Sequence, residues 1–437
     1  MQKPCQIKYK RTKRRVITRR GVLWLGQTCN LRCQFCYFLD RINSSEHPEQ
    51  AFMPLGKARI ICSSLVQHYN NCAVDIQGGE PTIYPDIHAL IAHCREIGLL
   101  PSLITNGVIL EDKTQCSTLK AAGVRDVLLS INGLGDTGDM IAGVPGCSRK
   151  QLVALDNLTE LSVPVRFNCV LSKPVLPQLV ELAELAVARG VRIVNFIALN
   201  LFEDQRRARQ CSETLPTFST VTPYLHDALD VLAGNDIEHN VRYYPLCMLK
   251  PGYRHAAYNF QQLPYDIHEW DYASMAWTGL TEQRMAHGPV SGVVSLRKVT
   301  PPTGPLSVTP FIALRHAVAR TLRPHPRAYA VATRLDRIFN DIHTHSARWF
   351  SDGNATVETV YKAHGRLRAS RSRYVYTKAC RQCAVRDICD GFHSDYLGLF
   401  GSDEATPILG NQAITDPKHY INDQVKYVEK EDWHWAM

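Results

Sequence analysis

Three cysteines near the start of the chain have a spacing that suits an iron–sulfur cluster. Cys29, Cys33 and Cys36 lie four and three positions apart and follow a short apolar run. Cysteine thiolates are the usual ligands of such clusters, and three of them can bind three irons of a 4Fe-4S cube. The fourth iron then stays open to a small molecule. A structural zinc site usually takes its ligands as two pairs, which this triplet does not provide.

A second group of cysteines lies near the other end of the chain. Cys380, Cys383 and Cys389 have the spacing C-x2-C-x5-C. Cys247 follows a strand-like run and a proline. Taken by themselves, these residues could form a zinc site, in which His393 or Cys247 joins the three C-terminal cysteines. An iron–sulfur cluster is the other possibility.

The elements that must position these residues follow from the hydrophobic pattern. Between residues 21 and 200, short apolar runs alternate with segments of helical spacing, which favours parallel strands joined by helical crossovers. The predicted strands are Gly21–Leu25, Ala73–Ile76, Leu100–Thr105, Val127–Asn132, Val165–Leu171 and Ile193–Leu199. The predicted helices are Lys57–Tyr69, Asp86–Ile97, Lys113–Ala122, Lys150–Leu161 and Leu176–Arg189.

We therefore predict an α/β fold, an open partial (β/α)6 barrel of the TIM type, with a smaller C-terminal cysteine-rich cluster domain. Active-site groups then belong on the loops at the C-terminal ends of the strands. After the barrel, Thr222-Pro223 is typical of a helix start, and Val241–Cys247 is strand-like. Pro310–Leu322 and Ala328–Phe350 are further helical candidates.

The chain divides into six predicted regions. They are a basic flexible tail (1–20), the barrel core (21–205), a connecting helix and strand (206–250), a helical or irregular insertion (251–375), an auxiliary cluster segment (376–402) and a C-terminal tail (403–437).

Composition excludes several classes of protein. The chain has no apolar run long enough to cross a membrane and no secretory signal, so we expect a cytoplasmic protein. Fifteen cysteines in that setting indicate metal or cluster ligation rather than disulfides. Nine of the first 20 residues are Lys or Arg and none is acidic, so the net charge of +9 comes from the tail. A solvated arm is the simpler interpretation, and docking to an anionic partner is the alternative. Without an RNA-binding signature, we expect no nucleic-acid partner.

The N-terminal cysteine triplet, with Phe35 directly before its last member, resembles the signature of the radical S-adenosylmethionine (radical SAM) superfamily. In that family the open iron chelates the amino and carboxylate groups of S-adenosylmethionine. The reduced cluster cleaves the sulfonium to a 5′-deoxyadenosyl radical, which abstracts a hydrogen atom from the substrate. The resemblance thus implies an enzyme whose cofactors are a 4Fe-4S cluster and S-adenosylmethionine.

Further motifs extend the resemblance over residues 21–200. Gly78, Gly79, Glu80 and Pro81, after the second predicted strand, look like the family's GGEP segment. There the glycines let the backbone approach the methionine amino group. Asn106, after the third strand, belongs to a sequence similar to the family's TNG turn.

The fourth and fifth predicted strands supply further candidate ligands of S-adenosylmethionine. Ser130 and Asn132 are similar to the family's S-x-D-G, with Asn132 standing where aspartate is commoner. Asn168 matches a polar position of the family and lies on the same strand face as Arg166. The family often carries an arginine before a glycine further on, where this chain has Ala142.

The C-terminal cysteines resemble the cluster segment of SPASM or twitch-type radical SAM proteins. This resemblance implies an auxiliary 4Fe-4S cluster held by Cys247, Cys380, Cys383 and Cys389. The full SPASM pattern has another cysteine about where His393 stands, and more downstream. We therefore expect one auxiliary cluster rather than two.

The substrate is not identified by these residues. Peptide-modifying relatives often carry a leader-binding domain before the barrel, whereas about 20 residues precede the first predicted strand here. This difference favours a small metabolite, with a peptide as the alternative. The resemblance also implies an electron donor such as flavodoxin or ferredoxin. Cys147, after the fourth strand, is a candidate hydrogen-atom donor, although an ordinary loop cysteine is the simpler interpretation.

Other functional classes remain as alternatives. Gly133–Gly138 fits G-x-G-x-x-G, but it follows the fourth predicted strand rather than the first. A dinucleotide fingerprint belongs in the first strand–helix turn, so we do not expect nicotinamide or flavin binding. A non-catalytic iron–sulfur scaffold or carrier would keep iron without making 5′-deoxyadenosine. The third class is a zinc- or nucleic-acid-binding protein that uses the basic tail, and its sign would be nucleic-acid binding that depends steeply on salt.

Overall fold

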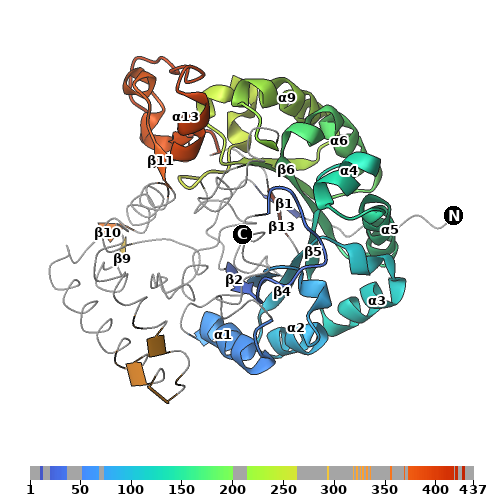
Figure 1. Cartoon of the computed structure of the whole chain (residues 1–437). Helices are drawn as coiled ribbons and strands as arrows, with labels where there is room; N and C mark the ends of the chain where they lie inside the picture. Colours follow the sequence, from blue (N-terminus) through green and yellow to red (C-terminus); the bar gives the residue numbers. More distant parts are fainter. Residues whose placement is uncertain are drawn as a thin grey trace.

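The computed structural model describes most of the barrel and of the C-terminal cysteine segment. The described residues are 10–12, 20–36, 52–67, 73–199, 214–262, 373–417, 419–421 and 426–428, with scattered positions between 293 and 369. The predicted helices Pro310–Leu322 and Ala328–Phe350 lie for the most part outside them. Figure 1 shows the described helices arranged around a curved sheet, with the C-terminal elements beside it.

A sheet of seven parallel strands forms the centre of the molecule. Its strand order, β2-β3-β4-β5-β6-β7-β8, follows the order of the chain. The strands are β2 (Arg20–Trp24), β3 (Ala73–Gln77), β4 (Leu100–Thr105), β5 (Asp126–Ser130), β6 (Val165–Leu171), β7 (Ile193–Ala198) and β8 (Glu238–Arg242). In the described part of the chain, β2 and β8 are not neighbours, so the barrel is open as predicted.

Helices cover the outer face of this sheet (Figure 1). They are α1 (Leu55–Gln67), α2 (Ile87–Glu96), α3 (Lys113–Ala122), α4 (Gly135–Ala142), α5 (Cys147–Glu160), α6 (Leu179–Ala188) and α9 (Phe218–Gly234). Each crossover returns the chain to the same end of the sheet, as parallel pairing requires. The loops after the strands are therefore gathered at one end of the barrel.

The two faces of the sheet differ in polarity because successive strand residues point to opposite sides. Val127 and Leu129 of β5 are buried in the apolar core shared with the helices. The alternate positions face the interior of the barrel and are often polar. There Asp126 Oδ1 lies 2.9 Å from Arg166 Nη2, and this ion pair is buried. The interior thus contains buried charged groups among apolar side chains such as Leu128.

Two elements after residue 205 differ from the sequence prediction. The predicted strand at Val241–Cys247 begins earlier, as β8, and adds a seventh strand to the expected six-stranded barrel. The helix predicted to start at Thr222-Pro223 starts at Phe218, where the Thr217 side chain accepts a hydrogen bond from Thr220 N. That side chain is the N-cap.

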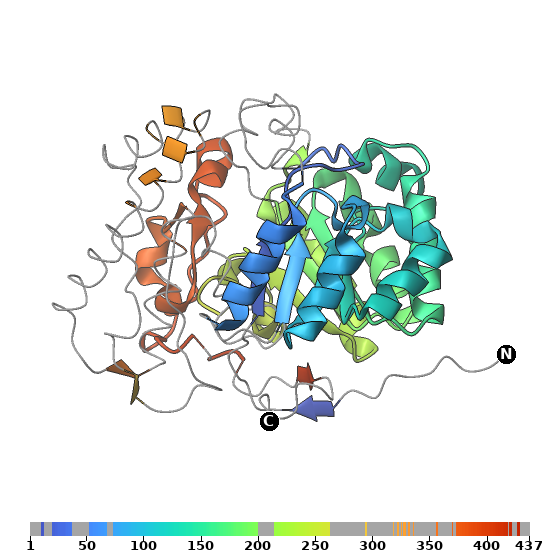
Figure 2. The same ribbon diagram turned by 90° about the horizontal axis from the view of Figure 1, so that it is seen from below.

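The C-terminal segment packs beside α9. It contains β11 (Tyr374–Val375), η9 (Ala379–Gln382), η10 (Arg386–Ile388), β12 (Phe392–His393) and α13 (Ser394–Phe400). The rings of Phe218 and Tyr396 lie 4.4 Å apart, and Phe218 N donates a hydrogen bond to the Tyr396 hydroxyl at 2.8 Å. Figure 2 shows these elements along one side of the barrel.

Two short antiparallel ladders lie outside the barrel. β1 (Lys10–Thr12) pairs with β13 (Lys426–Val428), so part of the basic region predicted as a flexible tail is a strand. β9 (Val293–Val294) pairs with β10 (Ala355–Thr356). Among the described residues, no helix combines the length and the apolar character that a membrane crossing needs.

Candidate functional site: two cysteine centres

The three cysteines of the N-terminal triplet lie on the loop that follows β2. Burial raises the pKa of Cys29 to about 11. Burial is also the main cause that raises the pKa of Cys33, and the neighbouring Cys36 and Cys29 thiols add to it. Cys29 and Cys33 pack against the same apolar cluster, which includes Leu31 and Cys147, and bound metal cations stabilise the thiolate forms of cysteines. The donor set therefore fits an iron–sulfur cluster.

The Gly78–Pro81 segment packs directly against the cysteine loop. A Cβ atom on Gly79 would lie 2.0 Å from the carbonyl oxygen of Thr28, and one on Gly78 would lie 2.6 Å from that of Gly26. Gly79 N donates to Gly26 O at 2.8 Å. The glycines are needed here because backbone meets backbone, and the contact fixes the start of the cysteine loop.

Glu80 connects the Gly78–Pro81 segment to the loop after β4. Its side chain is 1% exposed. Oε1 accepts hydrogen bonds from Thr82 N at 2.9 Å and from the Thr105 hydroxyl at 2.5 Å, and Oε2 accepts one from Asn106 N at 2.7 Å. Burial raises the pKa of Glu80, while these hydrogen bonds lower it. Glu80 therefore ties the loops after β3 and β4 together.

Asn106 links this network to the cysteine loop. Its Nδ2 donates to Asn30 Oδ1 at 2.7 Å and lies 3.8 Å from Cys29 Sγ. Gln151, which the sequence reasoning did not select, is buried and donates to Asn106 O at 2.8 Å and to Ser130 O at 2.9 Å. A lone glutamine in a helix carries no sequence signal for such a role.

The other candidate cofactor residues lie at the adjacent strand ends. Ser130 and Asn168 are register partners in β5 and β6, and both are half-buried. The Asn132 side chain accepts a hydrogen bond from Val170 N at 2.8 Å, which joins the ends of these two strands. The structure thus gathers these residues at one end of the sheet, while their contact with S-adenosylmethionine stays a prediction.

Cys147 is the first residue of α5 rather than a loop residue. Its side chain is fully buried and shares an apolar cluster with Leu31, against which Cys29 and Cys33 also pack. Its role as a hydrogen-atom donor stays a prediction.

The second cysteine group is drawn together by the C-terminal segment. Cys247, Cys380, Cys383 and Cys389 all line one small cavity. Burial raises the pKa of Cys247 to about 11 and is also the main cause of a raised pKa at Cys389. Four thiols around one space, of which Cys389 is buried and the other three are half-buried, come from segments more than 130 residues apart. This donor set fits a cluster. Among the described residues, no three His, Cys, Asp or Glu side chains gather closely enough to hold a single metal ion.

Backbone contacts shape this second centre. Gly391 has a φ of +85°, and a Cβ there would lie 2.4 Å from Val375 O, so glycine is required. Gly391 N donates to Cys389 Sγ at 3.4 Å. His393, the alternative zinc ligand, instead accepts a hydrogen bond from Asp395 N through Nδ1 at 3.2 Å.

Residues 403–417 belong to this centre as well, which the sequence reasoning did not foresee. Ala384 N donates to Ile408 O at 2.8 Å, and Ile414 N donates to Ala384 O at 2.7 Å. Thr406 lines the cysteine cavity. The first part of the predicted C-terminal tail is therefore structured and packs against the cysteine segment.

The G-x-G-x-x-G segment makes a different contact from a phosphate loop. Gly135 N donates a hydrogen bond to the Ser148 hydroxyl at 2.8 Å. A Cβ on Gly138 would lie 2.5 Å from Gly133 O, so its glycine serves a tight turn. A Cβ on Gly138 would also lie 3.0 Å from Cβ of Ser148 in α5, whereas the space around Gly135 is open.

The chain has an open parallel α/β barrel with a three-cysteine loop after the first strand of its sheet. The sequence profile of the radical SAM superfamily matches residues 25–186, which lie within this barrel. These residues form a radical SAM domain.

Related proteins share this domain over part of their length. The chain is 29% identical to the Fe-coproporphyrin III synthase of Methanosarcina barkeri over 153 residues, 35% of this chain and 37% of the relative. It is 31% identical to the PqqA peptide cyclase of Methylorubrum populi over 175 residues, 38% of this chain and 42% of the relative. The matches thus span less than half the length of these relatives.

Among solved structures, Streptococcus suis SuiB bound to S-adenosylmethionine is similar, with a TM-score of 0.44 and 17% identity. The similarity covers 52% of this chain and 51% of SuiB.

Proposed function

We propose that this chain is a radical SAM enzyme in which Cys29, Cys33 and Cys36 hold a 4Fe-4S cluster that binds S-adenosylmethionine at its open iron. When bound, this pair supplies a 5′-deoxyadenosyl radical that takes a hydrogen atom from the substrate. The observation that most supports the proposal is the three-thiol loop, packed against Gly79 and tied through Asn106 to the buried Glu80.

The chain's own residues would position the reactants. The glycine contact and the Glu80 network keep the cysteine loop fixed before any ligand arrives, so little ordering remains to be done on binding. Ser130, Asn132 and Asn168 would orient S-adenosylmethionine from the neighbouring strand ends. The barrel interior below them would receive the polar groups of the substrate.

The second centre would hold an auxiliary cluster. Cys247, Cys380, Cys383 and Cys389 are the proposed ligands, because all four line one cavity. We propose that this auxiliary unit comprises Cys247 and residues 376–402, together with the structured part of the predicted tail. A low-potential donor such as flavodoxin or ferredoxin would supply electrons. A reducing compartment, the cytoplasm, suits this many free thiols.

Two substrate classes stay open. The names of the relatives include a peptide cyclase and a porphyrin synthase, so both a peptide and a small metabolite have precedent among similar proteins. A peptide-modifying maturase is the alternative to an enzyme of small metabolites.

The test is anaerobic reconstitution with iron and sulfide, followed by dithionite and S-adenosylmethionine. Formation of 5′-deoxyadenosine is expected, and Cys33→Ala should reduce it to the level of a protein-free assay, because one cluster ligand is lost. Cys62→Ala is the matched control, since it removes a buried thiol from α1. Equal product from the wild type and from Cys33→Ala would refute the proposal and favour a non-catalytic iron–sulfur protein.

A further inference from the structure

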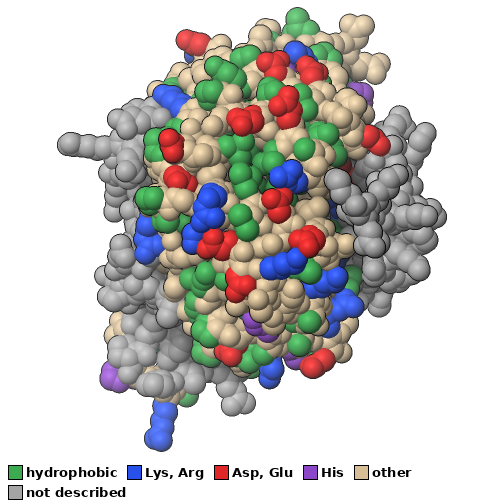
Figure 3. All heavy atoms as spheres, turned by 90° about the vertical axis from the view of Figure 1, so that its right-hand side faces the viewer, with side chains coloured by type: hydrophobic (Ala, Val, Ile, Leu, Met, Phe, Trp, Pro, Cys, Tyr) green, Lys and Arg blue, Asp and Glu red, His purple; other side chains and the backbone are tan. Residues whose placement is uncertain are grey.

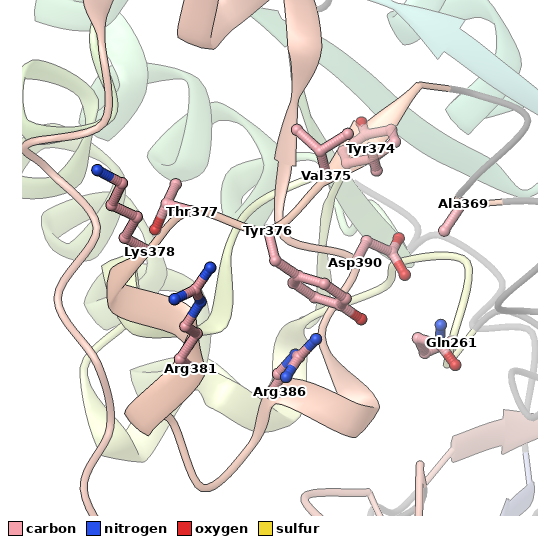
Figure 4. A pocket seen from close by; sticks show the side chains of 10 residues that line it. All are labelled: Gln261, Ala369, Tyr374, Val375, Tyr376, Thr377, Lys378, Arg381, Arg386 and Asp390. Carbon is pink, nitrogen blue, oxygen red and sulfur yellow. The ribbon is translucent and has the colours of Figure 1, made fainter.

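An open pocket lies on the C-terminal segment, beside the second cysteine centre. Its volume is about 580 Å³, which is within the range of ligand sites. Figure 4 shows Lys378 and Arg381 at one end of it and Gln261 at the other, with Tyr376 and Arg386 between them. Tyr376 and Arg386 also line the cysteine cavity, so the two spaces share a wall.

The charges in this pocket are unbalanced. Lys378, Arg381 and Arg386 are exposed cations in its lining, and among the described residues none of them forms an ion pair. The acidic side chain in the lining is Asp390, whose Oδ2 accepts a hydrogen bond from Phe260 N at 2.7 Å. The pocket therefore presents positive charge that is available to a ligand.

Several cations on the barrel helices, in contrast, form ion pairs with acidic side chains. Lys113 lies 2.5 Å from Glu160, Lys150 lies 2.5 Å from Glu111, and Arg189 lies 2.6 Å from Asp156. Figure 3 shows acidic and basic side chains interspersed over the face of the barrel that α3 and α5 help to form. Three cations that have no acidic partner among the described residues raise the positive potential of this hollow, which favours the binding of an anion.

One cation of the pocket is held in a fixed position. The Arg386 guanidinium lies 5.0 Å from the centre of the Tyr376 ring, a cation–π distance. The Tyr376 hydroxyl in turn donates to Cys389 O at 2.9 Å. This contact orders a planar, five-donor group before a ligand arrives, which suits two-point recognition of a carboxylate.

The pocket adjoins the end of the barrel where the radical chemistry is proposed. Tyr374 in its lining packs against Phe260, with ring centroids 5.8 Å apart, and Phe260 lies 5.4 Å from Tyr243. Tyr243 follows Arg242, the last residue of β8. A row of packed rings therefore connects the pocket to the C-terminal end of β8.

We propose that this pocket binds a carboxylate-bearing part of the substrate, through Arg381 and Arg386 with Lys378 in support. This inference rests on the proposed function, because it assigns the bound group to the substrate of that enzyme. The carboxylate can come from acidic side chains of a peptide or from a small polycarboxylate.

The experiment measures binding to the reconstituted full chain without reductant, by fluorescence anisotropy. The probes are fluorescein-labelled pentaglutamate and pentaglutamine. We expect pentaglutamate to bind and pentaglutamine to bind at least about tenfold more weakly, because the pocket selects charge. Arg381→Gln and Arg386→Gln should each weaken pentaglutamate binding by about tenfold, and added salt should weaken it further.

The control is Arg149→Gln, which removes the same charge from α5, where the Arg149 side chain is 69% exposed. It should leave binding within about twofold of the wild type. Competition by unlabelled citrate assigns the pocket to small polycarboxylates, whereas absence of competition assigns it to peptides. Iron content and absorbance check that each variant keeps its clusters. If Arg386→Gln loses iron, pentaglutamate binding by Arg381→Gln provides the test, because the Arg381 side chain is exposed.

Equal binding of the two probes, or an equal effect of Arg149→Gln and Arg381→Gln, would overturn the inference. Because no turnover is needed, a chain that binds pentaglutamate but makes no 5′-deoxyadenosine would refute the proposed function alone.

Discussion

Glu80 has a structural role that its place in the sequence motif does not predict. The GGEP resemblance marks it as a cofactor residue, whereas in the structure its carboxylate joins two loops of the barrel. Three hydrogen bonds from Thr82 N and from the Thr82 and Thr105 hydroxyls reach Oε1, and one from Asn106 N reaches Oε2. The residue therefore matters first for the shape of the cysteine loop.

We predict that Glu80→Gln destabilises the protein and lowers iron incorporation. In either orientation the new amide N–H group faces a backbone N–H donor, Thr82 N or Asn106 N, and a buried hydrogen bond is lost. The free energy of unfolding should fall by about 1–3 kcal/mol, measured by urea denaturation of the apoprotein. Glu160→Gln, at an exposed ion pair with Lys113, should change it by less than about 1 kcal/mol. Similar losses in the two variants would contradict this role.

At the scale of residues, the sequence predicts the candidates with local signatures and misses those without. The cysteines and the Gly78–Pro81 segment are recognisable from spacing. Gln151 and Thr406 reach the two centres only through the fold, because each lies far along the chain from the cysteines it supports. Long-range contacts of single polar residues leave no local pattern.

At the scale of elements, the seventh strand of the sheet, β8, begins earlier than predicted. Its residues are mostly polar, because three of its five positions, Glu238, Asn240 and Arg242, alternate on one face. Asn240 Nδ2 donates to Asn195 Oδ1 at 3.1 Å, so this polar side chain has a partner inside the barrel. A method that looks for apolar runs favours the next segment instead. The strands Leu100–Thr105 and Val165–Leu171, which have ordinary apolar patterns, agree with the prediction at both ends.

Helix α9 gives a prediction about pH. His226 is buried, and its Nε2 accepts a hydrogen bond from Lys250 N at 3.2 Å. Burial lowers the pKa of His226 below 6.5, and the nearby Lys250 lowers it further. The unfolded chain therefore binds a proton near pH 6.5 that the folded chain does not, so stability falls as pH decreases below about 6.5.

The variant His226→Gln removes this titration while keeping a side chain that can accept the hydrogen bond. Its free energy of unfolding should decrease less steeply than that of the wild type between about pH 6.5 and pH 5. Urea denaturation at a series of pH values measures the two slopes. Identical slopes would show that other groups control this pH range.

At the scale of the whole molecule, the second cysteine centre connects distant parts of the chain. Cys247 follows the barrel, and its three partner cysteines lie at positions 380 to 389. A cluster bound here would close a loop of more than 130 residues. Closing a long loop restricts the unfolded chain more than closing a short one.

Removal of iron should therefore lower thermal stability. Anaerobic chelation is expected to reduce the Tm by at least about 4 °C, which corresponds to roughly 1–2 kcal/mol. Cys389→Ser should already have the lower Tm, and chelation should shift it less than it shifts the wild type. Differential scanning fluorimetry under nitrogen measures both effects. A wild-type Tm that is indifferent to chelation would show that this centre does not tie the chain together.

An open barrel leaves two outer strands whose backbones are possible sites of aggregation, because an uncovered strand can pair with another molecule. At β8 this hazard is reduced by the chain itself, since Tyr258 N donates to Val241 O at 2.8 Å on the outer side of the strand. At β2, Met53 N donates to Leu25 O at 2.8 Å, just past the strand. The segments after each outer strand thus occupy backbone hydrogen-bonding groups that could otherwise pair with a second molecule.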